Sequence, residues 1–158
     1  MTNGEKLRIG RSILVSKITG KPRPFFVQYS LLNACNASCV YCNCPRRDDA
    51  RADRATHLRI LGEFARLGAA RIKFLGGEPL LHDDIGVLVD ETKRLGMRAA
   101  MVTNGFLVPQ RMDVIRKLDD VVISIDGSEA AHDAQRGRGT WKKVMAAIDA
   151  CAAACDRR

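Results

Sequence analysis

Four cysteines that stand close together in the sequence are the strongest candidates for a functional site. They stand at Cys35, Cys39, Cys42 and Cys44. Crowded thiolates repel one another as anions, so the first three indicate a loop that wraps around a cation. A ferredoxin-type run fits poorly, because it repeats two-residue gaps whereas three residues separate Cys35 from Cys39. Three thiolates on a cluster of four irons would leave one iron open to a substrate or cofactor.

Other interpretations of the cysteine spacing stay open at this point. A zinc site could use Cys44 as its fourth ligand, although one residue alone separates it from Cys42. A buried cysteine cluster without metal is the other alternative. Farther along the chain, Cys151 and Cys155 lie on the apolar stripe of a predicted helix, so we interpret them as small buried hydrophobes.

Repeated β-α units must position these cysteines. Four short apolar runs, rich in β-branched or large residues, alternate with segments of helical periodicity. The runs cover 25–31, 72–75, 98–103 and 121–125, and the helical segments cover 58–65, 85–95, 112–118 and 141–155. Each unit averages about 33 residues, the size of a parallel strand with its crossover helix. This predicts a parallel α/β fold, and the periodicity fits a doubly wound sheet or a barrel equally well.

Polar residues gather where each predicted strand ends. The sequence GGEP (76–79) follows the second strand, TNG (103–105) the third and ISIDG (123–127) the fourth, while the cysteines follow the first. Because carboxyl ends of parallel strands meet at one edge, these loops are expected to converge on one site. A closed (β/α)8 barrel needs about 250 residues, more than the 158 of this chain.

Composition and charge limit the remaining possibilities. The chain has 26 basic and 18 acidic residues, and no run of apolar residues is long enough to span a membrane. The N-terminus lacks the apolar core of a secretory signal, which predicts a cytoplasmic protein with reduced thiols. Residues 1–24 carry six basic groups against Glu5 but no interleaved aromatics, so we predict no nucleic-acid binding.

The basic leader forms the first of two predicted parts, 1–24 and 25–158. We expect it to be a helix that packs on the domain and continues into a short linker at Pro22 and Pro24. One loose apolar stripe runs along this helix: Leu7, Ile9, Ile13, Leu14 and Ile18.

Four motifs in order on successive strand ends resemble the radical S-adenosylmethionine (radical SAM) superfamily. Cys35, Cys39 and Cys42, with an aromatic before the last, match its CxxxCxΦC signature. GGEP is similar to the GGEP motif of the same superfamily. TNG, ISIDG and the stretch 132–137 (HDAQRG) resemble its peptide-, cofactor- and haem-modifying (SPASM-like) branch. The resemblance covers residues 25 to about 145, and a set of motifs is more specific than any one of them.

The resemblance implies the cofactors and their residues. A 4Fe-4S cluster would bind Cys35, Cys39 and Cys42, leaving one iron for the amino and carboxylate groups of S-adenosylmethionine. Residues implied to contact S-adenosylmethionine come from every strand end. Tyr41 would lie against the adenine, Gly76, Gly77, Glu78 and Pro79 would hold the methionyl ammonium, Ser124 the ribose, and Arg136 the carboxylate, with Asn104 and Asp126 in support.

Four of these assignments have alternatives. Tyr41 is also interpretable as a core tyrosine. Arg138 is close enough in sequence to compete with Arg136, and Asn104 and Asp126 are equally suited to capping turns.

The implied activity follows from the cofactors, and no catalytic residue is assignable beyond the cluster. The reduced cluster would cleave S-adenosylmethionine to a 5′-deoxyadenosyl radical that abstracts hydrogen from an unknown substrate. A flavodoxin- or ferredoxin-type electron donor is implied. Family cores usually have six β-α units and this chain supplies four, which predicts a truncated, partial TIM-type barrel with an exposed edge that a partner completes. The alternatives are a catalytically incomplete iron–sulfur and S-adenosylmethionine-binding fragment, or a zinc-binding interaction module.

Overall fold

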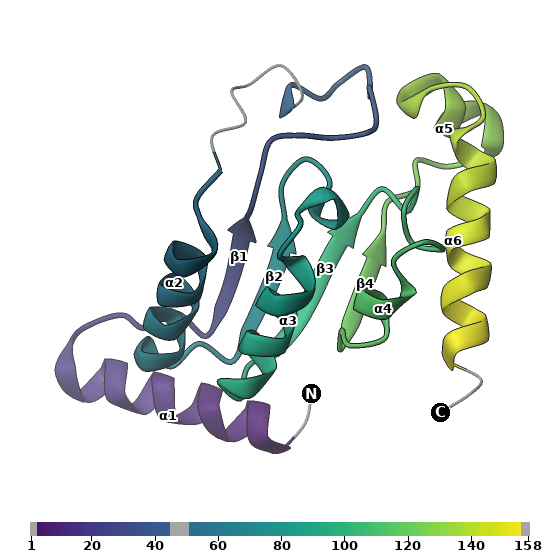
Figure 1. Cartoon of the computed structure of the whole chain (residues 1–158). Coiled ribbons are helices and arrows are strands. Elements are labelled where there is room, and N and C mark those ends of the chain that lie inside the picture. The colour runs from purple at the N-terminus through teal and green to yellow at the C-terminus, as the bar shows by residue number, and fades with distance from the viewer. Residues whose placement is uncertain (1–2, 45–50, 156–158) are drawn as a thin grey trace.

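A parallel four-stranded sheet forms the centre of the computed structural model, which describes residues 3–44 and 51–155 (Figure 1). The strands occur in the order β1-β2-β3-β4 along the sheet. They are β1 (Phe26–Ser30), β2 (Arg71–Leu75), β3 (Arg98–Thr103) and β4 (Asp120–Ile123). All four predicted strands are confirmed, and every pair of neighbours is parallel.

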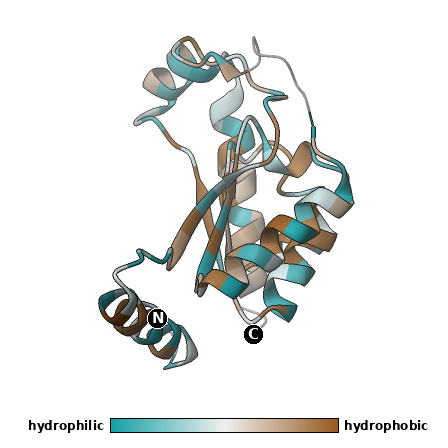
Figure 2. Cartoon of the chain, turned by 90° about the vertical axis from the view of Figure 1, so that its left-hand side faces the viewer, coloured by the Kyte–Doolittle hydropathy of each residue, from teal (hydrophilic) through white to brown (hydrophobic). Residues whose placement is uncertain are grey.

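The strand order decides between the two parallel architectures. Crossover connections are right-handed, so strands added always in the same direction place their helices on the same face. Helices α2 (Arg54–Leu67), α3 (Ile85–Arg94) and α4 (Met112–Ile115) accordingly lie on one face of the sheet, and Figure 2 shows the opposite face without a helix over it. A doubly wound sheet would reverse its order and carry helices on both faces. The fold is therefore the predicted partial TIM-type barrel with four β-α units.

Alternate side chains of the central strands form the core between the sheet and its helices. Ile72 and Phe74 on β2, with Ala99 and Met101 on β3, are fully buried against the helices. Their neighbours point to the opposite face, because successive side chains of a strand alternate. That face carries the partly exposed Arg71, Lys73 and Arg98, which occupy the side that would face the interior of a barrel.

Two helices follow β4. The second, α6 (Thr140–Cys155), is the predicted one, whereas the sequence analysis did not predict α5 (Glu129–Arg136) as a helix. The Ser128 side chain caps α5 by accepting a hydrogen bond from the backbone of Ala131. The Asp133 carboxylate accepts hydrogen bonds from the backbone N–H groups of Gly139 (2.6 Å) and Trp141 (2.8 Å), which ties α5 to the start of α6.

Helix α1 (Asn3–Thr19) is present, but most of its apolar stripe does not pack on the domain, and only Ile9 of the stripe is partly buried. Leu7 and Ile18 are 76% and 75% exposed, whereas Ser12 is buried. The Arg8 guanidinium donates to the carbonyls of Ala69 (3.1 Å) and Leu95 (2.8 Å). These carbonyls follow the ends of α2 and α3, where helices leave acceptors without intrahelical partners. The polar side of α1 therefore donates hydrogen bonds to the free carbonyls at the ends of α2 and α3. Most of the apolar stripe faces solvent.

A buried acidic residue anchors α1 beneath the sheet. Glu5 is 6% exposed and its carboxylate pairs with Arg71 (2.8 Å) and Arg98 (3.5 Å). Both arginines also pair with Asp120 at the start of β4. This network joins α1 to the amino ends of three strands.

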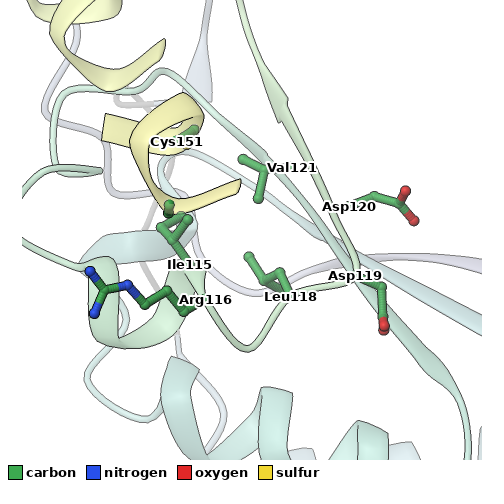
Figure 3. Close-up of a pocket in the computed structure, with 8 residues that line it drawn as sticks. Ile115, Arg116, Leu118, Asp119, Asp120, Val121 and Cys151 are labelled. Carbon is green, nitrogen blue, oxygen red and sulfur yellow. The ribbon is translucent and has the colours of Figure 1, made fainter. Parts of the chain in front are cut away.

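Among the residues that the structure describes, no strand pairs with the outer side of β4, which leaves a free edge there. A cleft lies between the base of β4 and α6. The cleft encloses about 200 Å³. Figure 3 shows the side chains of Ile115, Leu118 and Val121 turned toward this space, while the carboxylates of Asp119 and Asp120 point away. It lies at the amino ends of the strands, away from the loop that carries Cys35, Cys39 and Cys42. Within the described residues, no helix has the length and apolar character needed to cross a membrane.

Candidate functional site

The cysteine loop leaves the carboxyl end of β1 and lines a cavity of about 170 Å³. Cys35, Cys39 and Cys42 all border this cavity and form no disulfide. Most residues that the sequence assigns to the cofactor border it too: Tyr41, Gly76, Gly77, Asn104, Ser124 and Arg136. These residues come from all four strand ends, so the sheet brings together motifs that are up to a hundred residues apart in the chain.

The two glycines after β2 allow the cysteine loop to approach closely. A Cβ at Gly77 would lie 2.1 Å from the carbonyl oxygen of Ala34, and one at Gly76, whose φ is +144°, would lie 2.5 Å from that of Leu32. The Gly77 N–H donates to the Leu32 carbonyl at 2.8 Å. Glycine at both positions thus allows the loop after β2 to contact the cysteine loop, in addition to any contact with a ligand.

Glu78 is fully buried and does not border the cavity. Its Oε1 accepts hydrogen bonds from the Leu80 N–H (3.1 Å) and the Thr103 hydroxyl (2.8 Å). Its Oε2 accepts from the Asn104 N–H at 2.8 Å. Burial raises the pKa of Glu78, and the hydrogen bond from Asn104 opposes this effect. The carboxylate thus connects the turn after β2 to the turn after β3.

Asn104 extends this connection to the cysteine loop. Its side-chain amide donates to the Oδ1 of Asn36 (2.7 Å) and lies 3.6 Å from the Sγ of Cys35. Burial raises the pKa of the Cys35 thiol, while the hydrogen bonds from the Ala37 backbone and from Asn104 lower it. The first cysteine of the motif is therefore held by donors on two different loops.

Tyr41, Asp126 and Arg136 form a second connection across the cavity. The Tyr41 hydroxyl donates to Asp126 Oδ2 at 2.9 Å, and the Arg136 guanidinium donates to both oxygens of the same carboxylate, at 2.7 and 3.2 Å. Arg136 also lies over the Tyr41 ring, 5.8 Å from its centroid. The hydrogen bond from Arg136 lowers the pKa of Asp126.

His132 is a residue at this site that sequence reasoning missed. It is fully buried, and its Nδ1 accepts a hydrogen bond from the Asp126 N–H at 3.2 Å. On the same helix, the Gln135 carbonyl accepts from the Val40 N–H of the cysteine loop at 2.9 Å. The HDAQRG stretch, which the sequence analysis singled out, was the available signal for both contacts.

The other predicted residues lie around the cavity. Ser124 borders it and continues the sheet, donating from its N–H to the Thr103 carbonyl at 3.0 Å. Pro79 is buried at the first position of a short 3₁₀ helix. Cys44 donates from its N–H toward the Cys42 sulfur at 3.5 Å and does not border the cavity. Cys151 borders the distant cleft at α6, and the side chain of Cys155 lies outside the described residues.

The donor set at the cavity fits an iron–sulfur cluster. Three thiols face the same space, and thiolates are the ligands that such clusters prefer. In the described part of the chain, no three His, Cys, Asp or Glu side chains meet closely enough to surround a single metal ion. Three thiolates around one cavity would suit a cluster of several irons, because each thiolate would bind a different iron.

Comparison with known proteins agrees with this geometry. Residues 29–157 match the Radical SAM superfamily. The chain is 30% identical over 132 residues to the PqqA peptide cyclase of Gluconobacter oxydans, covering 78% of this chain and 37% of that protein. It is also 30% identical over 139 residues to the pre-heme d1 synthase of Dinoroseobacter shibae, covering 84% and 34%. The chain thus spans little more than a third of the length of these relatives.

A solved structure shares the fold. Streptococcus suis SuiB bound to S-adenosylmethionine superposes with a TM-score of 0.69 at 19% identity, covering 89% of this chain and 35% of that one.

Proposed function

This chain belongs to the radical SAM superfamily, and from that premise we propose that it binds a 4Fe-4S cluster and reductively cleaves S-adenosylmethionine. The observation that carries the proposal is the arrangement of Cys35, Cys39 and Cys42 around one cavity shared with Gly76 and Arg136. When bound, these cofactors supply an electron to the sulfonium and, after its carbon–sulfur bond breaks, a 5′-deoxyadenosyl radical that removes hydrogen from a substrate.

The protein's own residues supply binding and orientation. Two nitrogens of Arg136 donate hydrogen bonds to Asp126. The remaining N–H groups of its guanidinium can donate to the methionyl carboxylate. The backbone of Gly76 and Gly77 borders the cavity and can accept from the ammonium. Ser124 has a hydroxyl suited to the ribose. Because Glu78 directs its carboxylate into the protein, we assign it to holding the loops.

The compartment, electron donor and substrate are further parts of the proposal. Thiols that must bind iron favour a reducing compartment, which supports a cytoplasmic location. One-electron reduction requires a flavodoxin- or ferredoxin-type donor. The similarity to a peptide cyclase and a haem-precursor synthase supports a substrate of the peptide, cofactor or haem-precursor class.

The free edge of β4 supports a proposal about assembly. Val122 on this strand and Ile125 just after it are 46% and 47% exposed. An uncovered apolar edge strand recruits another strand. We propose that a fifth parallel strand, from additional polypeptide, pairs with β4. Without that polypeptide, we expect the isolated chain to self-associate through this edge in light scattering, and Val122→Lys should reduce the association. A wild-type chain that stays monomeric, or association that is unchanged in the variant, would contradict this.

Anaerobic reconstitution with iron and sulfide tests the main proposal. The readouts are iron content and 5′-deoxyadenosine formed after dithionite reduction. We expect about four irons per chain, with cluster and cleavage both lost in Cys39→Ser. The matched control is Cys44→Ser, since Cys44 belongs to the same loop and does not border the cavity.

The possible outcomes separate the alternatives. A stable cluster without cleavage would identify a catalytically incomplete fragment that lacks contacts from further strands. Retention of zinc in preference to iron, or no metal at all, would overturn the assignment.

A further inference from the structure

The side-chain amide of Asn104 is oriented toward the sulfur of Cys35. Its Oδ1 accepts a hydrogen bond from the Phe106 N–H at 3.0 Å, which places the nitrogen on the opposite side. That nitrogen has two N–H groups. One is used on Asn36 Oδ1 at 2.7 Å, and the other lies toward Cys35 Sγ at 3.6 Å. The orientation of the amide therefore follows from its own hydrogen bonds.

The turn that presents this amide is rigidly held. Glu78 accepts from both the Asn104 N–H and the Thr103 hydroxyl, and it does so in a fully buried position. The Gly105 N–H in turn donates to the Thr103 hydroxyl oxygen at 3.0 Å. The donor to Cys35 thus stands on a turn fixed by buried contacts, and side-chain motion is restricted at that position.

A hydrogen bond to a ligating sulfur changes the energy of electron transfer. Reduction adds negative charge to a cluster, and a donor aimed at its sulfur stabilises the more negative state. We propose that Asn104 is a positioning residue that raises the reduction potential of the cluster through its hydrogen bond to Cys35. This inference rests on the proposed function and assigns Asn104 to the cluster instead of to S-adenosylmethionine.

The test compares midpoint potentials of the reconstituted full chain and its Asn104→Ala variant by EPR-monitored titration. We expect the ratio of reduced to oxidised cluster at a fixed potential to fall up to tenfold, which corresponds to about 59 mV for one electron. The matched control is Asn36→Ala, which removes the other partner of the same amide and leaves its donor to Cys35 in place. Its midpoint should stay close to that of the wild type.

A second variant tests whether the effect of Asn104→Ala comes from a disrupted turn. Asn104→Asp retains an oxygen for the Phe106 N–H but has no N–H for the sulfur, and its carboxylate adds negative charge near Cys35. It should therefore shift the midpoint downward at least as far as Asn104→Ala. An unchanged midpoint in Asn104→Ala with a full cluster would overturn the inference and leave the proposed function intact. If neither variant retains a cluster, the amide is needed to hold Cys35 and not to tune it, which also overturns the inference. Failure of the wild type to take up a cluster would instead refute the proposed function.

Discussion

The Tyr41 hydroxyl donates a hydrogen bond to the carboxylate of Asp126, 85 residues away in the chain, at 2.9 Å. Tyr41 belongs to the loop after β1 and Asp126 to the turn after β4, which are the two outer strands of the sheet. The contact therefore joins the carboxyl ends of the two outer strands above the central pair. It closes one side of the cavity that the cysteines line.

Alkaline pH should weaken the contribution of this contact to stability. Burial, with the hydrogen bond to Asp126, raises the pKa of Tyr41 to about 12, against about 10 in an unfolded chain. Tyr41 thus contributes stability that is fully present below pH 10 and is lost as pH rises through about 12. The stability difference between wild type and Tyr41→Phe, measured by urea unfolding, should shrink above pH 10. A difference that grows with pH would contradict this assignment.

Removing Arg136 should weaken binding of S-adenosylmethionine. Loss of a charge-assisted hydrogen bond predicts an affinity about tenfold to a hundredfold lower for Arg136→Gln. Equilibrium dialysis with the cluster-loaded chain measures this directly. Arg138→Gln is the matched control, because Arg138 is exposed and two positions away. Equal losses in both variants would show that general charge, and not the position of Arg136, determines binding.

Truncation of Glu78 should destabilise the fold itself. Glu78→Ala leaves three buried donors without an acceptor, which predicts a loss of about 1–3 kcal/mol in the free energy of unfolding. Urea denaturation measures this free energy of unfolding. Glu63→Ala, at an exposed pair with Arg66, should change it by about 0.5 kcal/mol or less. Full stability of Glu78→Ala would show that the loops are held by other contacts.

Loss of Glu5 should loosen the N-terminal helix. Its carboxylate pairs with Arg71 and Arg98, whose side chains are 26% and 21% exposed. Breaking a buried pair is costly, but partial exposure of both arginines reduces the effect, so Glu5→Ala should lose about 1–3 kcal/mol. Chemical unfolding with Lys6→Ala as the exposed neighbouring control checks this. Equal stability of the two variants would argue against an anchoring role for Glu5.

The four strands, and the edge at which the polar loops meet, were predictable from the amino-acid sequence. Strand and helix periodicity depend on local spacing, and carboxyl ends of parallel strands must share an edge. For this reason Cys35, Gly77 and Ser124 could be assigned to one site before their distances were known. The cysteine spacing and the motifs that follow it were specific enough to indicate the family.

Contacts between distant segments were decided by the tertiary structure alone. The face of α1 that contacts the domain could not be predicted, because the sequence does not show that carbonyls at the ends of α2 and α3 accept from a donor such as Arg8. For Glu78, which is predicted to contact a ligand, the sequence did not show that its buried oxygens accept hydrogen bonds from Thr103 and Asn104 on the next loop. Hydrogen-bond partners depend on which groups lose water on folding, and spacing along one chain does not carry that information.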